Sequence, residues 1–176
     1  SLLLFGHTMD HTGGERSRVA EVGGWYDFQA VADKPQESII KGMRQFNNWI
    51  KSVMLCNYTT KGHDCILDLG CGKLGDLRKF DLACPRYYLG ADISKGSLES
   101  AIRDRIVSLK KDTFPMKLIR ASFFGNDLDT QLPSDIFFNL VTCQFSLHYA
   151  FGSETNARQL LKNASSRLTR GGYFLV

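Results

Sequence analysis

Short apolar segments alternate with longer amphipathic ones along most of the chain. Five short segments predict strands at residues 65–69, 87–91, 116–121, 136–143 and 173–176. Between them, apolar side chains share one face of predicted helices at residues 76–80, 96–110 and 154–168, and Gly171-Gly172 is expected to end the last helix. Alternating strands and helices indicate parallel strands joined by helical crossovers, hence an α/β domain with a doubly wound, mostly parallel sheet.

Another amphipathic segment precedes the first strand. From Ser38 to Cys56 the pattern predicts a helix that begins near Pro35-Gln36. Its core-facing stripe is expected to hold Ile39, Ile40, Met43, Phe46, Ile50, Val53 and Met54. Residues 1–36 show no steady apolar period, so we expect a loose or partly helical lead-in, followed by one domain over residues 37–176. The last predicted strand would leave an unpaired apolar edge, so we expect this domain to be incomplete at its C-terminus.

Composition narrows the class of protein. A length of 176 residues, with 43% hydrophobic and 23% charged residues, suits one globular domain. No apolar run approaches the roughly 20 residues that span a bilayer, so neither a membrane protein nor a secreted one is expected. The net charge of +4 permits a polyanionic partner without requiring one. Five cysteines without a C-x-x-C pair, and His7 and His11 without a metalloprotease glutamate, support neither disulfides nor a metal site.

A glycine-rich turn follows the first predicted strand. Gly70 and Gly72 allow a sharp turn and the close approach of a ligand, and Asp92 ends the neighbouring strand, where a carboxylate can accept hydrogen bonds from ribose hydroxyls. Gly70-x-Gly72-x-x-Gly75 also matches the dinucleotide fingerprint, so a nicotinamide-dependent oxidoreductase stays open. Asp68 favours the methyl donor S-adenosylmethionine, because an acid there would repel a pyrophosphate but suits an ammonium group. A turn that binds nothing is the remaining alternative.

Two further segments carry polar side chains amid apolar ones. In F-N-N-W-I-K-S, residues 46–52, Asn47 and Lys51 share one helix face, which could equally be a solvated surface. In C-Q-F-S-L-H-Y-A-F, residues 143–151, polar groups follow the fourth strand and should open on the same crevice. A buried Tyr–His pair that satisfies itself would explain the second segment equally well.

Taken together, these segments resemble the cellular mRNA cap (guanine-N7) methyltransferase family. The matching stretches over residues 38–176 are, in the family's order, F-N-N-W-I-K-S, L-D-L-G-C-G-K, G-A-D-I, C-Q-F-x-x-H-Y-A-F and G-G-Y-F. The resemblance implies a Rossmann-like class I methyltransferase fold whose C-terminal part is missing from this chain. It also implies transfer of a methyl group from S-adenosylmethionine to N7 of the cap guanine, with S-adenosylhomocysteine as product. Capped RNA with a GpppN end, other capping proteins and a nuclear location follow from the same resemblance.

The resemblance also implies roles for individual residues. Positions expected to bind the methyl donor are Lys51, Asp68, Gly70, Gly72, Asp92, Ser122, Gln144 and Tyr149. Positions expected to hold the cap are Asn47, Asn48, Lys73, Lys79 and His148. No catalytic residue is expected, because N7 has a lone pair and no proton, so alignment can supply the catalysis.

Some positions depart from the family's pattern. Leu74 stands where glycine is usual and Ser122 where aspartate is usual, and the family's arginine after the second strand has no clean match near Arg103 and Arg105. The nearest candidate for its H-Y-N motif is Trp25-Tyr26-Asp27, and its later aromatic and acidic cap contacts have no counterpart in this sequence. These departures leave open a non-catalytic donor- or RNA-binding module. A small-molecule methyltransferase is also open, although such an enzyme should lack the F-N-N-W-I-K helix.

Overall fold

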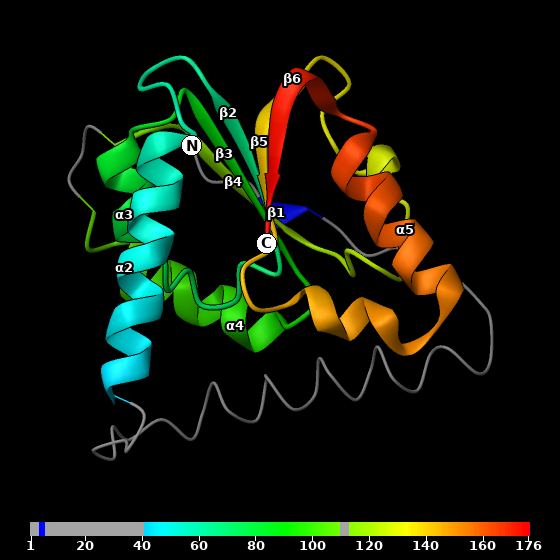
Figure 1. Ribbon diagram of the computed structural model, residues 1–176, viewed down its shortest axis with the longest axis horizontal. Coiled ribbons are helices and arrows are strands. Elements are labelled where there is room, and N and C mark those ends of the chain that lie inside the picture. The colour runs from blue at the N-terminus through cyan, green and yellow to red at the C-terminus, as the bar shows by residue number, and fades with distance from the viewer. Residues whose placement is uncertain (1–3, 6–40, 110–112) are drawn as a thin grey trace.

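A parallel β-sheet forms the centre of the molecule (Figure 1). The computed structural model describes residues 4–5, 41–109 and 113–176. Within these ranges six strands, each parallel to its neighbours, form one sheet in the order β1-β4-β3-β2-β5-β6. The strands are β1 (Leu4–Phe5), β2 (Cys65–Leu69), β3 (Tyr87–Asp92), β4 (Met116–Arg120), β5 (Phe138–Thr142) and β6 (Leu168–Leu175). The doubly wound α/β sheet predicted from the sequence is therefore confirmed.

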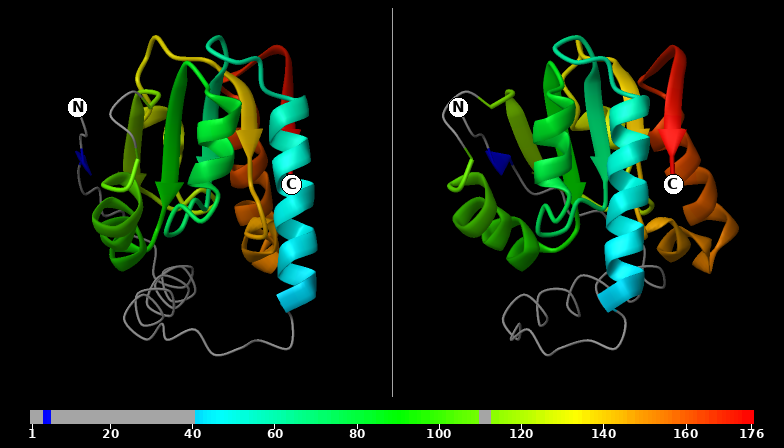
Figure 2. Two further views of the ribbon diagram at one scale, coloured as in Figure 1. Left: turned by 90° about the vertical axis from the view of Figure 1, so that its left-hand side faces the viewer. Right: turned by 60° about the vertical axis from the view of Figure 1, so that its left-hand side comes forward.

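Helices cover both faces of this sheet (Figures 1 and 2). On one side lie α2 (Lys41–Asn57), α3 (Leu77–Ala83) and α4 (Lys95–Ser100), the last continuing into the π-turn η1 (Ala101–Ile106). On the other lies α5 (Glu154–Ser165), and two 3-10 turns connect the strands, η2 (Leu128–Thr130) and η3 (Leu147–Gly152). Two apolar clusters result, one on each face of the sheet.

The sequence forms these strands because both of their faces are buried. All five residues of β2 are buried. Along it, Leu67 joins the cluster beneath α5, while Ile66 joins the cluster beneath α3 and α4. Parallel sheets covered on both faces give such continuous apolar runs, which explains why the predicted bounds of this strand were correct.

The last strand begins earlier than predicted. The helix α5 ends at Ser165, and Gly171-Gly172 lies inside β6 instead of ending the helix. Gly171 has φ +81°, near the irregular register between β5 and β6. A Cβ on Gly172 would lie 2.8 Å from the carbonyl oxygen of Asn139 on β5. These glycines therefore serve a strand irregularity and a close backbone approach.

The prediction for α2 was only partly correct. The helix exists, but within it only Leu55 is buried, while Met43, Phe46 and Val53 of the predicted core stripe are exposed. Ile39, Ile40 and Pro35-Gln36 lie outside the described residues, as do His7, His11 and Trp25-Tyr26-Asp27. The segment at 96–110 was expected to be one helix, but it changes from α4 to the π-turn at Ala101.

The N-terminal part of the chain contributes β1, which the sequence pattern did not predict. It pairs with β4 at the edge of the sheet. The predicted boundary between residues 36 and 37 lies outside the described residues and stays a prediction. No helix among the described residues is long and apolar enough to cross a membrane.

Candidate functional site

A hollow lies where the segments after four adjacent strands meet. Phe123 follows β4, Asp92 ends β3, Gly70 follows β2 and Gln144 follows β5, which is also the order of these strands in the sheet. The full lining is Gly70, Gly72, Asp92, Ile93, Phe123, Phe124, Gln144, Phe145, Ser146 and Tyr149. The carboxyl ends of parallel strands are where ligands bind in open α/β sheets. The sequence predicted this crevice, and Gly70, Gly72, Asp92, Gln144 and Tyr149 of the expected donor residues line it.

The glycine turn brings backbone to the surface of the hollow. Gly70 has φ +77° and Gly72 φ +53°, in the left-handed region that glycine tolerates best. The amide of Gly70 donates to the carbonyl oxygen of Ala91 at 2.8 Å, which ties the turn to β3. A Cβ on Gly70 would meet the side chain of Ser146, whereas one on Gly72 would meet nothing within 4 Å. The turn therefore leaves open space beside Gly72, where a ligand can approach the main chain.

Asp92 fastens two backbone segments at the centre of the hollow. Its Oδ2 accepts a hydrogen bond from the amide of Gly72 at 2.7 Å, and its Oδ1 accepts one from the amide of Ser94 at 2.8 Å. Ser94 in turn caps α4 by accepting from the amide of Ser97 at 3.0 Å. Each carboxylate oxygen has two lone pairs, so Asp92 can still accept from a ligand hydroxyl.

Asp68 lies beneath the hollow and is absent from its lining. Tyr88 Oη donates to one carboxylate oxygen and Thr142 Oγ1 to the other, each at 2.7 Å. Burial raises the pKa of Asp68 from 3.8 to about 6, although the hydrogen bonds from Thr142 and Tyr88 lower it. Through these bonds Asp68 connects three neighbouring strands directly below the glycine turn.

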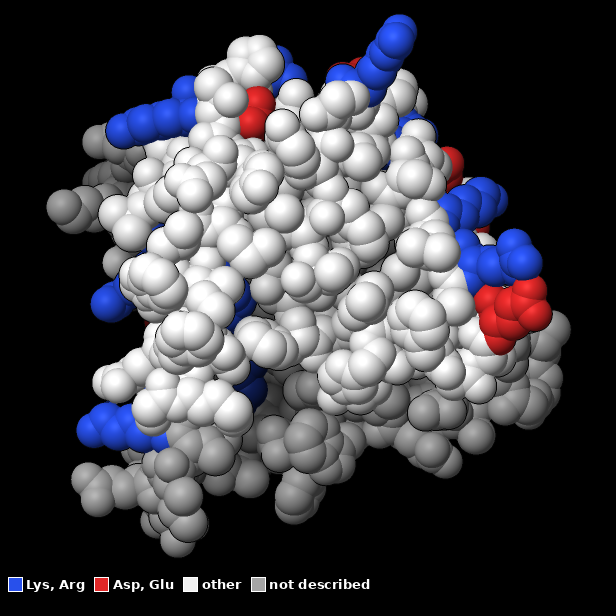
Figure 3. Space-filling model, in the orientation of Figure 1, with Lys and Arg blue, Asp and Glu red and all other residues white. Residues whose placement is uncertain are grey.

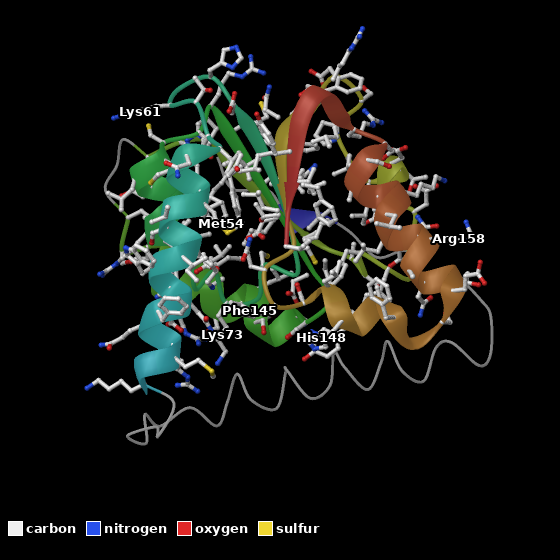
Figure 4. All side chains as sticks on the ribbon, viewed as in Figure 1. Met54, Lys61, Lys73, Phe145, His148 and Arg158 are labelled. Atoms are coloured by element: carbon white, nitrogen blue, oxygen red, sulfur yellow. The ribbon has the colours of Figure 1, made fainter. Side chains whose placement is uncertain are left out.

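The wall that follows β5 is polar. The Nε2 atom of Gln144 is buried and has no hydrogen-bond partner among the described residues. Ser146 Oγ donates to the carbonyl oxygen of Leu69 at 3.2 Å. The rings of His148 and Tyr149 lie 4.0 Å apart, but His148 is exposed, so the alternative of a buried self-satisfying pair is wrong. Figure 4 shows Phe145, His148 and Lys73 at this edge of the sheet.

The helix α2 reaches the site through ion pairs with Asp76. Lys51 Nζ donates to one carboxylate oxygen at 2.7 Å and Lys79 Nζ to the other at 2.6 Å. Lys79 also donates to Asn48 Oδ1 at 3.1 Å, and Lys51 Nζ lies 5.2 Å from the centre of the Phe145 ring. The side chain of Lys51 is only 14% exposed, so this part of α2 is not the solvated face considered from the sequence.

The remaining predicted residues lie around the hollow without lining it. Asn47 and Lys73 are half-buried, and Ser122 is buried with its Oγ accepting from the amide of Gly125 at 2.8 Å. Leu74 has φ +55°, and its side chain is 1% exposed within the core cluster beneath α3 and α4. The unusual leucine therefore points its side chain into the core. The described residues contain no group of three or more potential metal ligands.

Sequence reasoning missed several residues of the site. They are Asp76, Ile93, Phe123, Phe124, Phe145 and Ser146. The available signal was position, because all but one directly follow the end of a strand or of its first turn. Phenylalanine and isoleucine there carry no chemistry of their own, so the pattern assigned them only to the core.

Comparisons with known proteins agree with one another. The mRNA (guanine-N(7))-methyltransferase domain model matches residues 15–176. The mRNA cap guanine-N(7) methyltransferase 1 of Oryza sativa subsp. japonica is 39% identical over 168 residues, covering 92% of this chain and 45% of that protein. The mRNA cap guanine-N(7) methyltransferase of Saccharomyces cerevisiae is 41% identical over 144 residues, covering 77% of this chain and 31% of that protein. The chain thus spans less than half the length of these relatives.

Solved structures share the fold. The N-methyltransferase NodS of Bradyrhizobium japonicum, in complex with S-adenosyl-L-homocysteine, has a TM-score of 0.64 at 15% identity and covers 86% of this chain and 70% of its own. An S-adenosylmethionine-dependent methyltransferase of Clostridium acetobutylicum has a TM-score of 0.53 at 21% identity, covering 88% of this chain and 55% of its own. At these identities the likeness concerns the fold, and it confirms the predicted Rossmann-like class I methyltransferase fold.

Proposed function

The chain belongs to the mRNA (guanine-N(7))-methyltransferase family, and from that premise we propose that its protein methylates N7 of the cap guanine of mRNA. The membership agrees with the sequence motifs and disfavours the nicotinamide alternative. The proposal concerns the whole protein, of which this chain corresponds to less than half in its curated relatives.

The observation that carries the proposal is the convergence of three kinds of group on one hollow. An acid ends β3, an open glycine turn follows β2, and an amide without a partner follows β5. S-adenosylmethionine fits this set, since its ribose hydroxyls can donate to Asp92 and its carboxylate can accept from Gln144 Nε2. Buried polar groups are normally paired, so Gln144 calls for a ligand acceptor.

The donor supplies a methyl group on a positively charged sulfur. The lone pair of guanine N7 forms the new N–C bond while the S–C electron pair stays on sulfur, so positive charge passes to the guanine ring and no proton moves. The residues of the hollow therefore have to align the two reactants and exclude water. Such alignment can supply about 7–11 kcal/mol of the barrier.

Positive charge near the hollow supports an anionic second substrate. Lys73 and Lys79 stand near the glycine turn and the start of α3, and His148 is exposed at the β5 side. Figure 3 shows Lys or Arg atoms recessed beside α2, while the centre of that face is uncharged. We propose that these residues, with Asn47 and Asn48, hold the guanine and phosphates of capped RNA, so that binding weakens as salt rises. A nuclear location and partners from the capping apparatus belong to the same proposal.

A methyl-transfer assay tests the function. The full-length protein is incubated with radiolabelled S-adenosylmethionine and a GpppN-capped RNA, next to the same RNA without a cap and the same RNA already methylated at N7. Label is expected in the unmethylated cap alone. Binding of S-adenosylhomocysteine without any transfer would favour the non-catalytic module, and transfer to small acceptors but not to the cap would favour a small-molecule methyltransferase.

A further inference from the structure

The two ends of the hollow differ in chemistry. The end below β3 and β4 is formed by Ile93, Phe123 and Phe124, which are all apolar. The opposite end, below β2 and β5, has the polar side chains of Gln144 and Ser146. A donor with a flat base at one end and an amino acid at the other matches this gradient in one direction only, with the base between the phenylalanines and Ile93.

Polar side chains near the apolar end are occupied inside their own loop. Ser122 Oγ accepts from the amide of Gly125 at 2.8 Å, and Asn126 Oδ1 accepts from the amide of Ser122 at 3.0 Å. Neither side chain is part of the lining. The loop therefore closes on itself and presents phenylalanine rings, not hydrogen-bonding side chains, to the hollow.

Asn163 of α5 fixes that loop from behind. It is 1% exposed, and its Nδ2 donates to the carbonyl oxygens of Phe123 at 2.9 Å and Asn126 at 2.7 Å. Its Oδ1 accepts from the amide of Leu128 at 3.0 Å. Because the backbone is held at three points, the apolar wall is rigid, and a polar side chain cannot easily turn toward a bound base.

We propose that the apolar end holds the purine of the donor by its faces, without a side-chain hydrogen bond to the edge of the base. The inference rests on the proposed use of S-adenosylmethionine. Its consequence is weak discrimination between adenine and hypoxanthine, which differ at the edge of the ring and hardly at its faces. A site built to hydrogen-bond a group rejects an analogue lacking it far more strongly than an apolar surface does.

Two ligands measured on one protein test this inference. The full-length protein is titrated calorimetrically with S-adenosyl-L-homocysteine and with S-inosyl-L-homocysteine. We expect the two dissociation constants to agree within about tenfold, a difference below 1.4 kcal/mol. A larger gap would overturn the inference but leave the proposed function intact. Failure of S-adenosyl-L-homocysteine to bind would instead overturn the proposed function, and the inference with it.

Two variants separate the faces of the base from its edge. Ser122→Ala should leave the ratio of the two dissociation constants unchanged, because the hydroxyl is engaged with Gly125. Phe123→Leu should weaken both ligands by the same factor, because it removes an aromatic face that both share. The ratio is measured within one protein sample, so a loss of stability affects both ligands alike. A ratio altered by either variant would show that the loop reads the edge of the base and would refute the inference.

Discussion

The ammonium of Lys51 lies 2.7 Å from the carboxylate of Asp76 and joins α2 to the start of α3. The second carboxylate oxygen accepts from Lys79 at 2.6 Å, so one acid holds two lysines from different helices. The three side chains are only 12–17% exposed. Asp76 therefore sets the position of the helix segment that carries the expected cap and donor contacts.

The Lys51–Asp76 pair should contribute measurably to stability. A double-mutant cycle with Lys51→Ala and Asp76→Ala, followed by urea unfolding, is expected to give a coupling of about 1–2 kcal/mol, because water screens this pair poorly. The matched control is the pair Arg158–Glu154, whose side chains are 77% and 76% exposed. An exposed pair should show almost no coupling. Equal coupling in the two cycles would contradict the role given to Asp76.

Gly70 should matter for the site in a way that Gly62 does not. Both have positive φ, +77° and +71°, so alanine strains both turns by about 1–2 kcal/mol. Only at Gly70 would the new Cβ also meet side chains, 2.8 Å from Ser146 Cβ and 3.1 Å from the Phe123 ring. Gly70→Ala should therefore lower the affinity for S-adenosylhomocysteine about tenfold or more. Gly62→Ala should lower the unfolding free energy but leave the affinity as it is.

The sheet could be predicted from the sequence because parallel strands covered on both faces are apolar throughout. β2 appears with its predicted bounds for this reason. The start of β6 was missed because Gly171-Gly172 was interpreted as a helix end, although it accompanies a strand irregularity. β1 was missed because two residues carry no periodicity.

The site was predictable where chemistry is visible in the residue type. Asp92 and the glycines were found because a strand-ending acid and a glycine turn have few other uses. Asp76 was missed because its partners come from α2, and contacts between distant segments leave no local pattern. Phe123 was missed because a phenylalanine that lines a ligand site looks like a core residue in the sequence.

Asp92 should dominate donor binding. Asp92→Asn keeps the size of the side chain but loses one acceptor and the negative charge, so a ribose hydroxyl and the amides of Gly72 and Ser94 compete for a single oxygen. We expect S-adenosylhomocysteine to bind about tenfold more weakly or worse, since a hydrogen bond to a charged group contributes about 1.5–3 kcal/mol. Calorimetric titration measures the change. The control is Asp81→Asn, an exposed acid on α3, and equal losses in both variants would argue against this site.

Asp68 should make stability depend on pH. Its pKa is about 6 in the folded protein, against an ordinary value of 3.8. Between these values the folded state keeps a proton that the unfolded state has lost. The contribution of Asp68 to the free energy of unfolding is therefore greatest below pH 3.8 and falls as pH rises toward 6, by up to about 3 kcal/mol.

Asp68→Asn should remove this part of the pH dependence. Asparagine stays uncharged, so the variant should gain stability relative to the natural protein as pH rises from 4.5 to about 7. Urea unfolding at the two pH values measures the difference, which cancels the titration of all other groups that the substitution leaves alone. The exposed Asp135 gives the control, because Asp135→Asn should shift stability equally at both pH values. If Asp68→Asn also shifted stability equally at both, the carboxyl would titrate alike in the folded and unfolded chains, and burial beneath the glycine turn would not raise its pKa.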